Sequence, residues 1–286
     1  NMEFLWQYKD TANVAIIGSS RTYYGVNPLL FSEPVFAVNF GVPYSVISKH
    51  SYFFHNYIFP HFKKLKVLIA SIDLDRFFFT GNNSKNIFYT SYKSYPGYVY
   101  DKNHDFWKGK NTDELYQLTY DSPGEKSLAE ILRPSRGFMP TNANGWGDPE
   151  VDEDSIWRDN EFKIFYNNKD ILIDLLDICE ENNIYFIGVI FPQNPRYKET
   201  GAYGFDGLQR SIAPSIFQEI QELSNTHPHF LLVDENKYGD HDYTDDMAQD
   251  ASHLSALGAE QLTHRLDSLI QTLNIDFENV EESESR

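Results

Sequence analysis

Two short stretches, far apart in the sequence, carry side chains that could act together in ester chemistry. Residues 18–21 (Gly-Ser-Ser-Arg) follow an apolar run, so Ser20 could sit on a tight strand-to-helix turn, beside backbone N–H groups suited to an oxyanion. Asp250 and His253 stand near the other end with the spacing Asp-x-x-His. That spacing lets the carboxylate accept the imidazole Nδ1–H, so that Nε2 can take a proton from a serine. The alternatives are a turn capped by a serine and a solvated surface pair.

The elements that must position these residues alternate between short β-branched runs and helical periodicity. This alternation predicts an α/β fold with a five-stranded parallel sheet. Strands are expected at 13–17, 35–39, 66–72, 184–191 and 230–233, and helices at 44–62, from 161 to 179, at 211–224 and at 255–273. Ligands bind such sheets at the carboxyl ends of the strands, so the loops of Ser20 and His253 should open on one edge.

The order Ser, Asp, His along this fold resembles an SGNH (GDSL-type) hydrolase. Gly18-Ser19-Ser20 matches the first block of that superfamily, with Ser20 as nucleophile, and the Gly-Ser-Ser form resembles a divergent branch that includes acyl-transfer proteins of the D-alanylation and alginate O-acetylation type. Asp250 and His253 match the final block, which continues in the typical Leu-Ser-Ala-Leu-Gly-Ala. The resemblance implies a three-layer α/β/α (flavodoxin-like) sandwich. It also implies an oxyanion hole with the N–H groups of Ser20 and Gly41.

The third block departs from the family pattern. Where the family has Gly-x-Asn-Asp, residues 70–73 are Ala-Ser-Ile-Asp, so Ile72 replaces an asparagine that would donate to the oxyanion. Losing one such donor costs about 10²–10³ in rate unless another group substitutes. Asn194 is the expected substitute, with Asn39 as a second candidate. The same departure supports an alternative, a binding module that has lost activity.

Residues 73–160 form an insertion rich in Tyr, Asn, Gly, Pro and Ser, far longer than an ordinary connection. Aromatic side chains are frequent in it, including Trp146 and a tyrosine cluster at Tyr89, Tyr92, Tyr95, Tyr98 and Tyr100. Exposed rings beside Asn and Asp suit sugar rings, whereas the alternative is that they pack onto the core. We expect the insertion to form a lid or a substrate wall, with Trp146 contacting substrate.

Three further side chains are predicted near the substrate. The loop at 195–207 follows the fourth strand and should rim the site, so Arg196 and Tyr203 could contact substrate, although a plain surface loop is the alternative. Arg21 follows the nucleophile and could orient an acyl or carboxylate group, or pair with an acidic side chain. Asp73 and Asp75 are expected to cap a helix or brace a loop.

Composition excludes several function classes. The chain has 24 Lys and Arg against 42 Asp and Glu, a formal charge of −18, which disfavours nucleic acid and anionic membranes as partners. Cys179 is the only cysteine, which excludes a disulfide scaffold and a cysteine zinc cluster. The acidic run at 240–246 does not fit an EF-hand, and no nucleotide-binding motif follows a strand, so neither a metal nor a cofactor is predicted.

These patterns predict one domain over residues 1–276, followed by an acidic, disordered tail at 277–286. The abrupt start at Asn1-Met2 suggests a preceding targeting segment or partner domain. Compartment (periplasm, cell surface, secreted or cytoplasm) and oligomeric state stay open. The predicted function is a serine esterase that removes an acyl group, expected to be acetyl, from a carbohydrate ester. The alternatives are an O-acyltransferase acting on a sugar or cell-envelope polymer, and an inactive carbohydrate-binding module.

Overall fold

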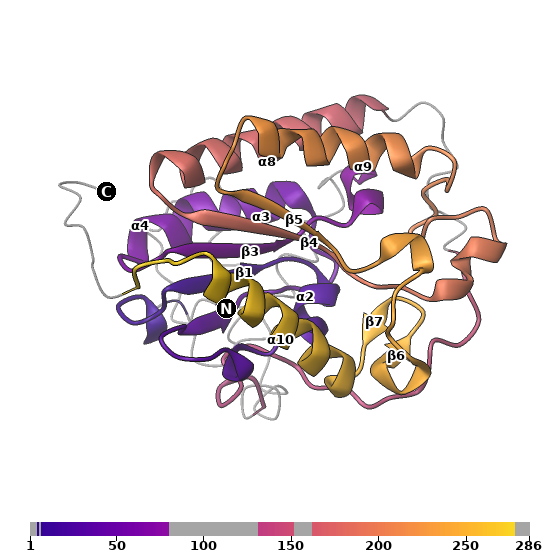
Figure 1. The fold of residues 1–286 in the computed structure, drawn as a ribbon, viewed down its shortest axis with the longest axis horizontal. Helices are drawn as coiled ribbons and strands as arrows, with labels where there is room; N and C mark the ends of the chain where they lie inside the picture. Colours follow the sequence, from indigo (N-terminus) through magenta and orange to yellow (C-terminus); the bar gives the residue numbers. More distant parts are fainter. Residues whose placement is uncertain (1–4, 6, 80–130, 152–161, 278–286) are drawn as a thin grey trace, which may run out of the picture.

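The centre of the molecule is a five-stranded, all-parallel sheet, shown in Figure 1. This computed structural model describes residues 5, 7–79, 131–151 and 162–277. The strand order is β2-β1-β3-β4-β5, the doubly wound order of flavodoxin-like folds. The predicted fold class is therefore confirmed. The strands are β1 (Val14–Ile17), β2 (Ala37–Asn39), β3 (Val67–Ser71), β4 (Tyr185–Ile190) and β5 (Phe230–Asp234).

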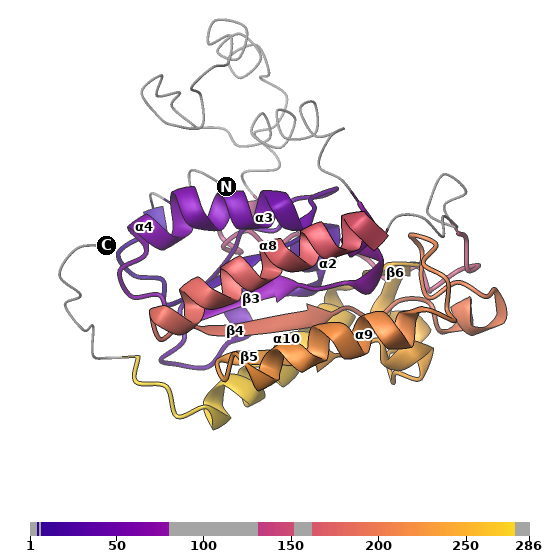
Figure 2. The same cartoon turned by 90° about the horizontal axis from the view of Figure 1, so that it is seen from above.

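Helices cover both faces of the sheet, which explains why its strands read as continuous apolar runs. In β1, Ala15 and Ile17 belong to one hydrophobic cluster and Val14 and Ile16 to the other. The first cluster packs under α3 (Ile47–Phe53), α4 (Phe59–His61), α8 (Phe162–Glu181) and α9 (Ala213–Gln221). The second packs against α10 (Ala256–Thr272). Figure 1 shows these layers edge-on, and Figure 2 shows α3, α8 and α9 side by side across the sheet.

Two local features differ from the sequence prediction. The helix expected over 44–62 is divided into α3, a π-helical turn at Phe54–Ile58, and α4. Pro60 lies in the first turn of α4 and lacks an N–H, so the regular α-helical ladder cannot run through this point. A short antiparallel hairpin, β6 (Ala248–Asp250) and β7 (His253–Leu254), was not predicted.

Part of the long insertion crosses the carboxyl edge of the sheet. We call residues 136–148 the strap. Backbone hydrogen bonds attach it to β2, to α2 (Ser20–Gly25), to β6 and to the start of α10: Asn39 N to Arg136 O (2.9 Å), Met139 N to Tyr23 O (3.0 Å), Asn144 N to Ala248 O (3.0 Å) and Ala256 N to Thr141 O (2.9 Å). Gly137 has φ +96°, and a Cβ there would lie 2.0 Å from Asn39 O, so this crossing needs glycine.

The predicted tyrosine cluster of the insertion (Tyr89–Tyr100) lies outside the described residues, as does most of the acidic tail. Among the helices that the structure describes, none is long and apolar enough to cross a membrane.

Candidate active site

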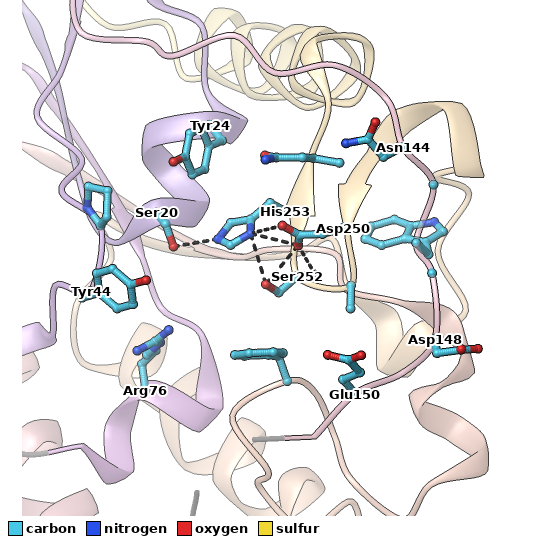
Figure 3. A pocket seen from close by; sticks show the side chains of 17 residues that line it. Ser20, Tyr24, Tyr44, Arg76, Asn144, Asp148, Glu150, Asp250, Ser252 and His253 are labelled. Atoms are coloured by element: carbon cyan, nitrogen blue, oxygen red, sulfur yellow. Dashed lines mark hydrogen bonds and ion pairs between the residues drawn. The ribbon is translucent and has the colours of Figure 1, made fainter. Parts of the chain in front are cut away.

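Ser20, His253 and Asp250 lie in one hydrogen-bonded line, shown in Figure 3. Ser20 Oγ is 2.7 Å from His253 Nε2. His253 Nδ1 is 2.9 Å from both carboxylate oxygens of Asp250. The structure thus brings together the three residues that the sequence nominated, although 233 positions separate the serine from the histidine.

The turn after β1 positions the serine. Gly18 has φ +154°, and a Cβ there would lie 2.4 Å from Thr22 Oγ1, so only glycine permits this close turn. Ser19 is the N-cap of α2, and its Oγ accepts the Arg21 N–H at 3.3 Å. Ser20 is the first residue of α2, where backbone N–H groups have no partner within the helix. The sequence left open whether this turn carries a capping serine or a nucleophile. In the structure Ser19 caps the helix, and Ser20 faces His253.

The β6–β7 hairpin positions the other two residues. Asp250 and His253 are cross-strand partners in it. The Ser252 N–H donates to Asp250 Oδ1 at 2.9 Å and holds the carboxylate in place. The ring of Tyr24, one turn along α2 from Ser20, packs edge-on against the His253 ring with centroids 5.3 Å apart and an interplanar angle of 81°. Asp250 therefore holds the imidazole at Nδ1, and the Tyr24 ring packs against it.

The electrostatics of the pair set the direction of proton transfer. Burial acts to raise the pKa of Asp250, but hydrogen bonds from His253 and the neighbouring backbone outweigh it, and the pKa lies below its ordinary value. Asp250 is therefore ionised at neutral pH and can only accept hydrogen bonds. The proton between them belongs to His253 Nδ1, which leaves Nε2 as the acceptor for the Ser20 hydroxyl.

The line opens into a cavity of about 560 Å³, a size typical of small-molecule sites. Aromatic and polar side chains share its lining: Tyr24, Tyr44, Trp146 and Phe205, with Asn144, Asp148, Glu150, Gln249 and Ser252. Arg76 is the one cationic side chain among the described lining residues. Tyr44 is 69% exposed and has φ +60°, an uncommon conformation for a bulky residue.

Comparison with known proteins finds no matching family model and no matching curated protein. Among solved structures, a "putative acylhydrolase" from Bacteroides fragilis aligns at 8% identity and a TM-score of 0.48 over 95% of this chain and 96% of its own. A "putative platelet activating factor from Streptococcus pneumonia" aligns at 13% and 0.47 over 94% and 92%. A catalytic mutant of an acetylxylan esterase from Geobacillus stearothermophilus aligns at 11% and 0.26 over 95% and 98%.

The predicted oxyanion donors beyond Ser20 are otherwise engaged. The Gly41 N–H donates to Asn39 Oδ1 at 2.8 Å, and the Asn39 amide donates to Thr22 O and Val26 O. The prediction for Asn194 is wrong, because its amide donates to the Trp146 and Gly147 carbonyls of the strap at 3.1 and 3.0 Å. Both asparagines thus stabilise the backbone around the site.

Arg21 is wrong as a substrate contact and lies in a buried ion network. Its guanidinium is 2% exposed and lies 3.2 Å from a carboxylate oxygen of each of Asp73, Asp75 and Asp206. Burial acts to lower the pKa of Arg21, but these three carboxylates outweigh it and hold the pKa above its ordinary value. The pairing alternative is correct for Arg21, and Asp73 and Asp75 serve this network.

Of the three other predicted substrate contacts, one lines the cavity and two do not. Tyr203 is wrong, because it is buried with its ring against Tyr238 at a centroid separation of 5.5 Å. Arg196 lies outside the Ser20 cavity, in a neighbouring hollow, and pairs with Asp148 at 3.1 Å. Trp146 does line the cavity, but it is 4% exposed and its Nε1–H donates to Tyr243 O at 3.2 Å.

Sequence reasoning missed several lining residues, among them Tyr24, Tyr44 and Arg76. A signal existed for Tyr24, since a residue four positions after Ser20 shares its helix face. For Arg76 the signal was its place soon after the third strand, at the ligand-binding edge.

Proposed function

We propose that this protein is a serine ester hydrolase in which Ser20 is the nucleophile, His253 the general base and acid, and Asp250 the residue that orients His253. The observation that carries the proposal is the continuous hydrogen-bonded line from Ser20 Oγ through the imidazole to the Asp250 carboxylate at 2.7 and 2.9 Å. The same line favours catalysis over the alternative of an inactive binding module.

The chemistry follows the serine triad. Ser20 Oγ attacks the ester carbonyl carbon while its proton passes to His253 Nε2. The tetrahedral oxyanion collapses, the bond from carbon to the alcohol oxygen breaks, and the leaving alcohol takes the proton from His253. Water then attacks the acyl-serine, gives a proton to His253, and releases the carboxylic acid as Ser20 regains its proton. The backbone N–H of Ser20 itself is the donor that we assign to the oxyanion.

We further propose a carbohydrate ester, with acetyl as the acyl group. The cavity around His253 combines polar and aromatic side chains. In Figure 3 Asn144 and Ser252 lie on the Asp250 side of the imidazole, and the ring of Tyr44, which is 69% exposed, lies near Ser20. An aromatic face beside amide and hydroxyl groups suits a sugar ring, whose C–H face stacks while its hydroxyls find hydrogen-bond partners.

The test of the serine mechanism is hydrolysis of p-nitrophenyl acetate by the wild type, Ser20→Ala and Ser19→Ala. Ser19→Ala is the matched control, because Ser19 has a capping role on the same turn. We expect Ser20→Ala to abolish turnover above the uncatalysed rate and Ser19→Ala to keep most of it. Equal activity in Ser20→Ala and the wild type would refute the nucleophile assignment.

The substrate class needs a separate measurement. Release of acetate from acetylated xylooligosaccharides and from ethyl acetate should show a higher kcat/KM for the sugar esters. Adding the unacetylated sugar at high concentration tests the transferase alternative, which requires new acetylated sugar among the products. Equal kcat/KM for both ester types would refute the carbohydrate assignment while leaving the triad intact.

A further inference from the structure

The active site lacks a side-chain donor where the resemblance to SGNH hydrolases places one. Ile72 occupies that position and is 1% exposed, packed against Gly188 of β4. The N–H of Gly41 and the amides of Asn39 and Asn194 are committed elsewhere. A tetrahedral intermediate on Ser20 would need a donor beyond the Ser20 N–H.

The same segment of chain brings a different donor to the cavity. After β3 the backbone enters a 3₁₀ helix at Leu74–Phe78, and Arg76 of this helix lines the cavity together with Ser20. Figure 3 shows its guanidinium end directed toward Ser20 and Tyr44, whereas Tyr24 lies on the opposite side of the serine.

The guanidinium is paired with a carboxylate on the side of its inner nitrogen. Arg76 Nε lies 2.9 Å from Asp206 Oδ2, and Asp206 is in turn 3.2 Å from Arg21. The guanidinium also lies over the Phe79 ring, with Cζ 5.2 Å from the centroid. An arginine whose ion pair lies on the Nε side keeps its two outer nitrogens, each with two N–H donors, available for another acceptor.

We propose that Arg76 is a catalytic residue that donates from its outer guanidinium nitrogens to the oxyanion on Ser20, in place of the asparagine that Ile72 replaces. The proposal rests on the proposed serine mechanism. Negative charge develops on the carbonyl oxygen only during the reaction, so a positively charged donor stabilises the transition state more than the bound ester. Charge-assisted hydrogen bonds of this kind are also stronger than neutral ones.

The test compares Arg76→Met, Arg76→Lys and the control Arg210→Met, all with the wild type and Ser20→Ala as references. Arg210 is a suitable control because its guanidinium donates to Tyr238 O at 2.7 Å, away from the cavity. We measure kcat and KM for p-nitrophenyl acetate and for p-nitrophenyl hemisuccinate, whose acyl group carries a carboxylate. Thermal unfolding checks that each variant is folded. A further variant, Arg76→Ala, leaves space for a free guanidinium ion, and added guanidinium chloride at millimolar concentration tests whether it restores activity.

We expect Arg76→Met to lower kcat about 10²–10³-fold for both esters with little change in KM. Arg76→Lys should lie in between, Arg210→Met should match the wild type, and guanidinium should restore part of the activity of Arg76→Ala.

Unchanged kcat in a folded Arg76→Met would overturn the proposal. So would a rise in KM confined to the hemisuccinate, which would make Arg76 a binding residue for an acyl carboxylate. Loss of activity without rescue by guanidinium, in a variant with a lowered melting temperature, would also overturn it in favour of a structural role. A wild type that is inactive, or as active as Ser20→Ala, would instead refute the proposed function itself.

Discussion

Ser20 and Arg21 are neighbours in the sequence but belong to two different polar clusters. Ser20 joins His253 and Asp250 at the cavity, where the His253 and Asp250 side chains are 20% and 48% exposed. Arg21 joins Asp73, Asp75 and Asp206 beneath the cavity, where no side chain is more than 4% exposed. Both clusters pair aspartate carboxylate with a nitrogen-bearing side chain, one aspartate in the first and three in the second, yet we propose catalysis for the first and stability for the second.

The two clusters differ in their access to the cavity and in how many of their hydrogen-bond donors already have partners. In the buried network the Arg21 guanidinium meets three carboxylates and also donates to Gln193 Oε1 at 2.9 Å, so nothing is left for a substrate. In the Ser20–His253–Asp250 cluster the Ser20 hydroxyl is hydrogen-bonded only to His253 among the described residues, and Ser20 lines the cavity. An arginine beside a nucleophile is therefore not evidence of substrate binding until its partners are known.

The largest effect that separates the clusters should come from the base. His253→Ala removes the proton acceptor and should lower kcat for p-nitrophenyl acetate by about 10⁴–10⁶-fold. Its free energy of unfolding should change by about 1 kcal/mol or less, because the imidazole is at the cavity surface. Steady-state kinetics and urea unfolding of the same preparation measure both quantities. A collapse of stability would place His253 in a structural cluster.

Asp250→Asn sharpens the comparison by keeping the shape and removing the charge. An asparagine that donates to Nδ1 favours the wrong tautomer of His253, and we expect kcat to fall by about 10³–10⁴-fold. The low pKa of Asp250 adds a pH effect of known sign. A carboxylate whose pKa is depressed in the folded protein contributes stability above its unfolded pKa, and this is lost as the pH falls through the folded value. The wild type should therefore lose stability relative to Asp250→Asn below about pH 4.

Arg21→Met breaks the buried cluster, so its main effect should be on stability and not on the chemical step. It removes the cation shared by three buried carboxylates, of which Asp206 still has the ion pair with Arg76. We expect it to destabilise the fold by about 3–5 kcal/mol. Arg21→Lys should recover only part of this loss, because one ammonium cannot reproduce the guanidinium's planar contacts. Urea unfolding gives these values. A melting temperature equal to that of the wild type would show that the network is not needed for stability.

Asp206→Asn should give the smallest effect, and it tests the buried network through the pH dependence of the free energy of unfolding. Burial raises the pKa of Asp206 to about 6, even though Arg76 and Arg21 oppose the shift. A raised pKa means that ionising this carboxyl costs stability as the pH rises from its unfolded pKa to the folded value. Removing the charge should therefore stabilise the variant relative to the wild type by about 2–3 kcal/mol more at pH 8 than at pH 4. A constant difference between the two pH values would contradict the raised pKa.

The sequence was sufficient to predict the sheet and to predict that Ser20, Asp250 and His253 lie close together, because the signals for both are local. Apolar runs set the strands, and the residues directly after β1 and before α10 must reach the carboxyl edge, which brings Ser20 near His253. The turn signal of Gly18 and the Asp-x-x-His spacing are readable within a few positions.

The sequence failed where a residue's partners come from distant segments. Asn194 and Gly41 follow strands and are in the expected places, but strap carbonyls and the Asn39 side chain take up their donors. One of the carboxylates that pairs with the buried Arg21 belongs to Asp206, which is 185 positions away. Tyr203 is also buried by packing that no local pattern reveals.

The central claim is that Ser20 is the nucleophile, and covalent capture tests it most directly. A fluorophosphonate transfers its phosphonyl group to an activated serine: the serine oxygen bonds to phosphorus, fluoride leaves, and the hydroxyl proton passes to the base. Mass spectrometry of the digested protein locates the adduct. We predict one adduct, on the peptide that contains Ser20, absent after Ser20→Ala and strongly slowed in His253→Ala. An adduct on another residue, or labelling that persists in Ser20→Ala, would contradict the account.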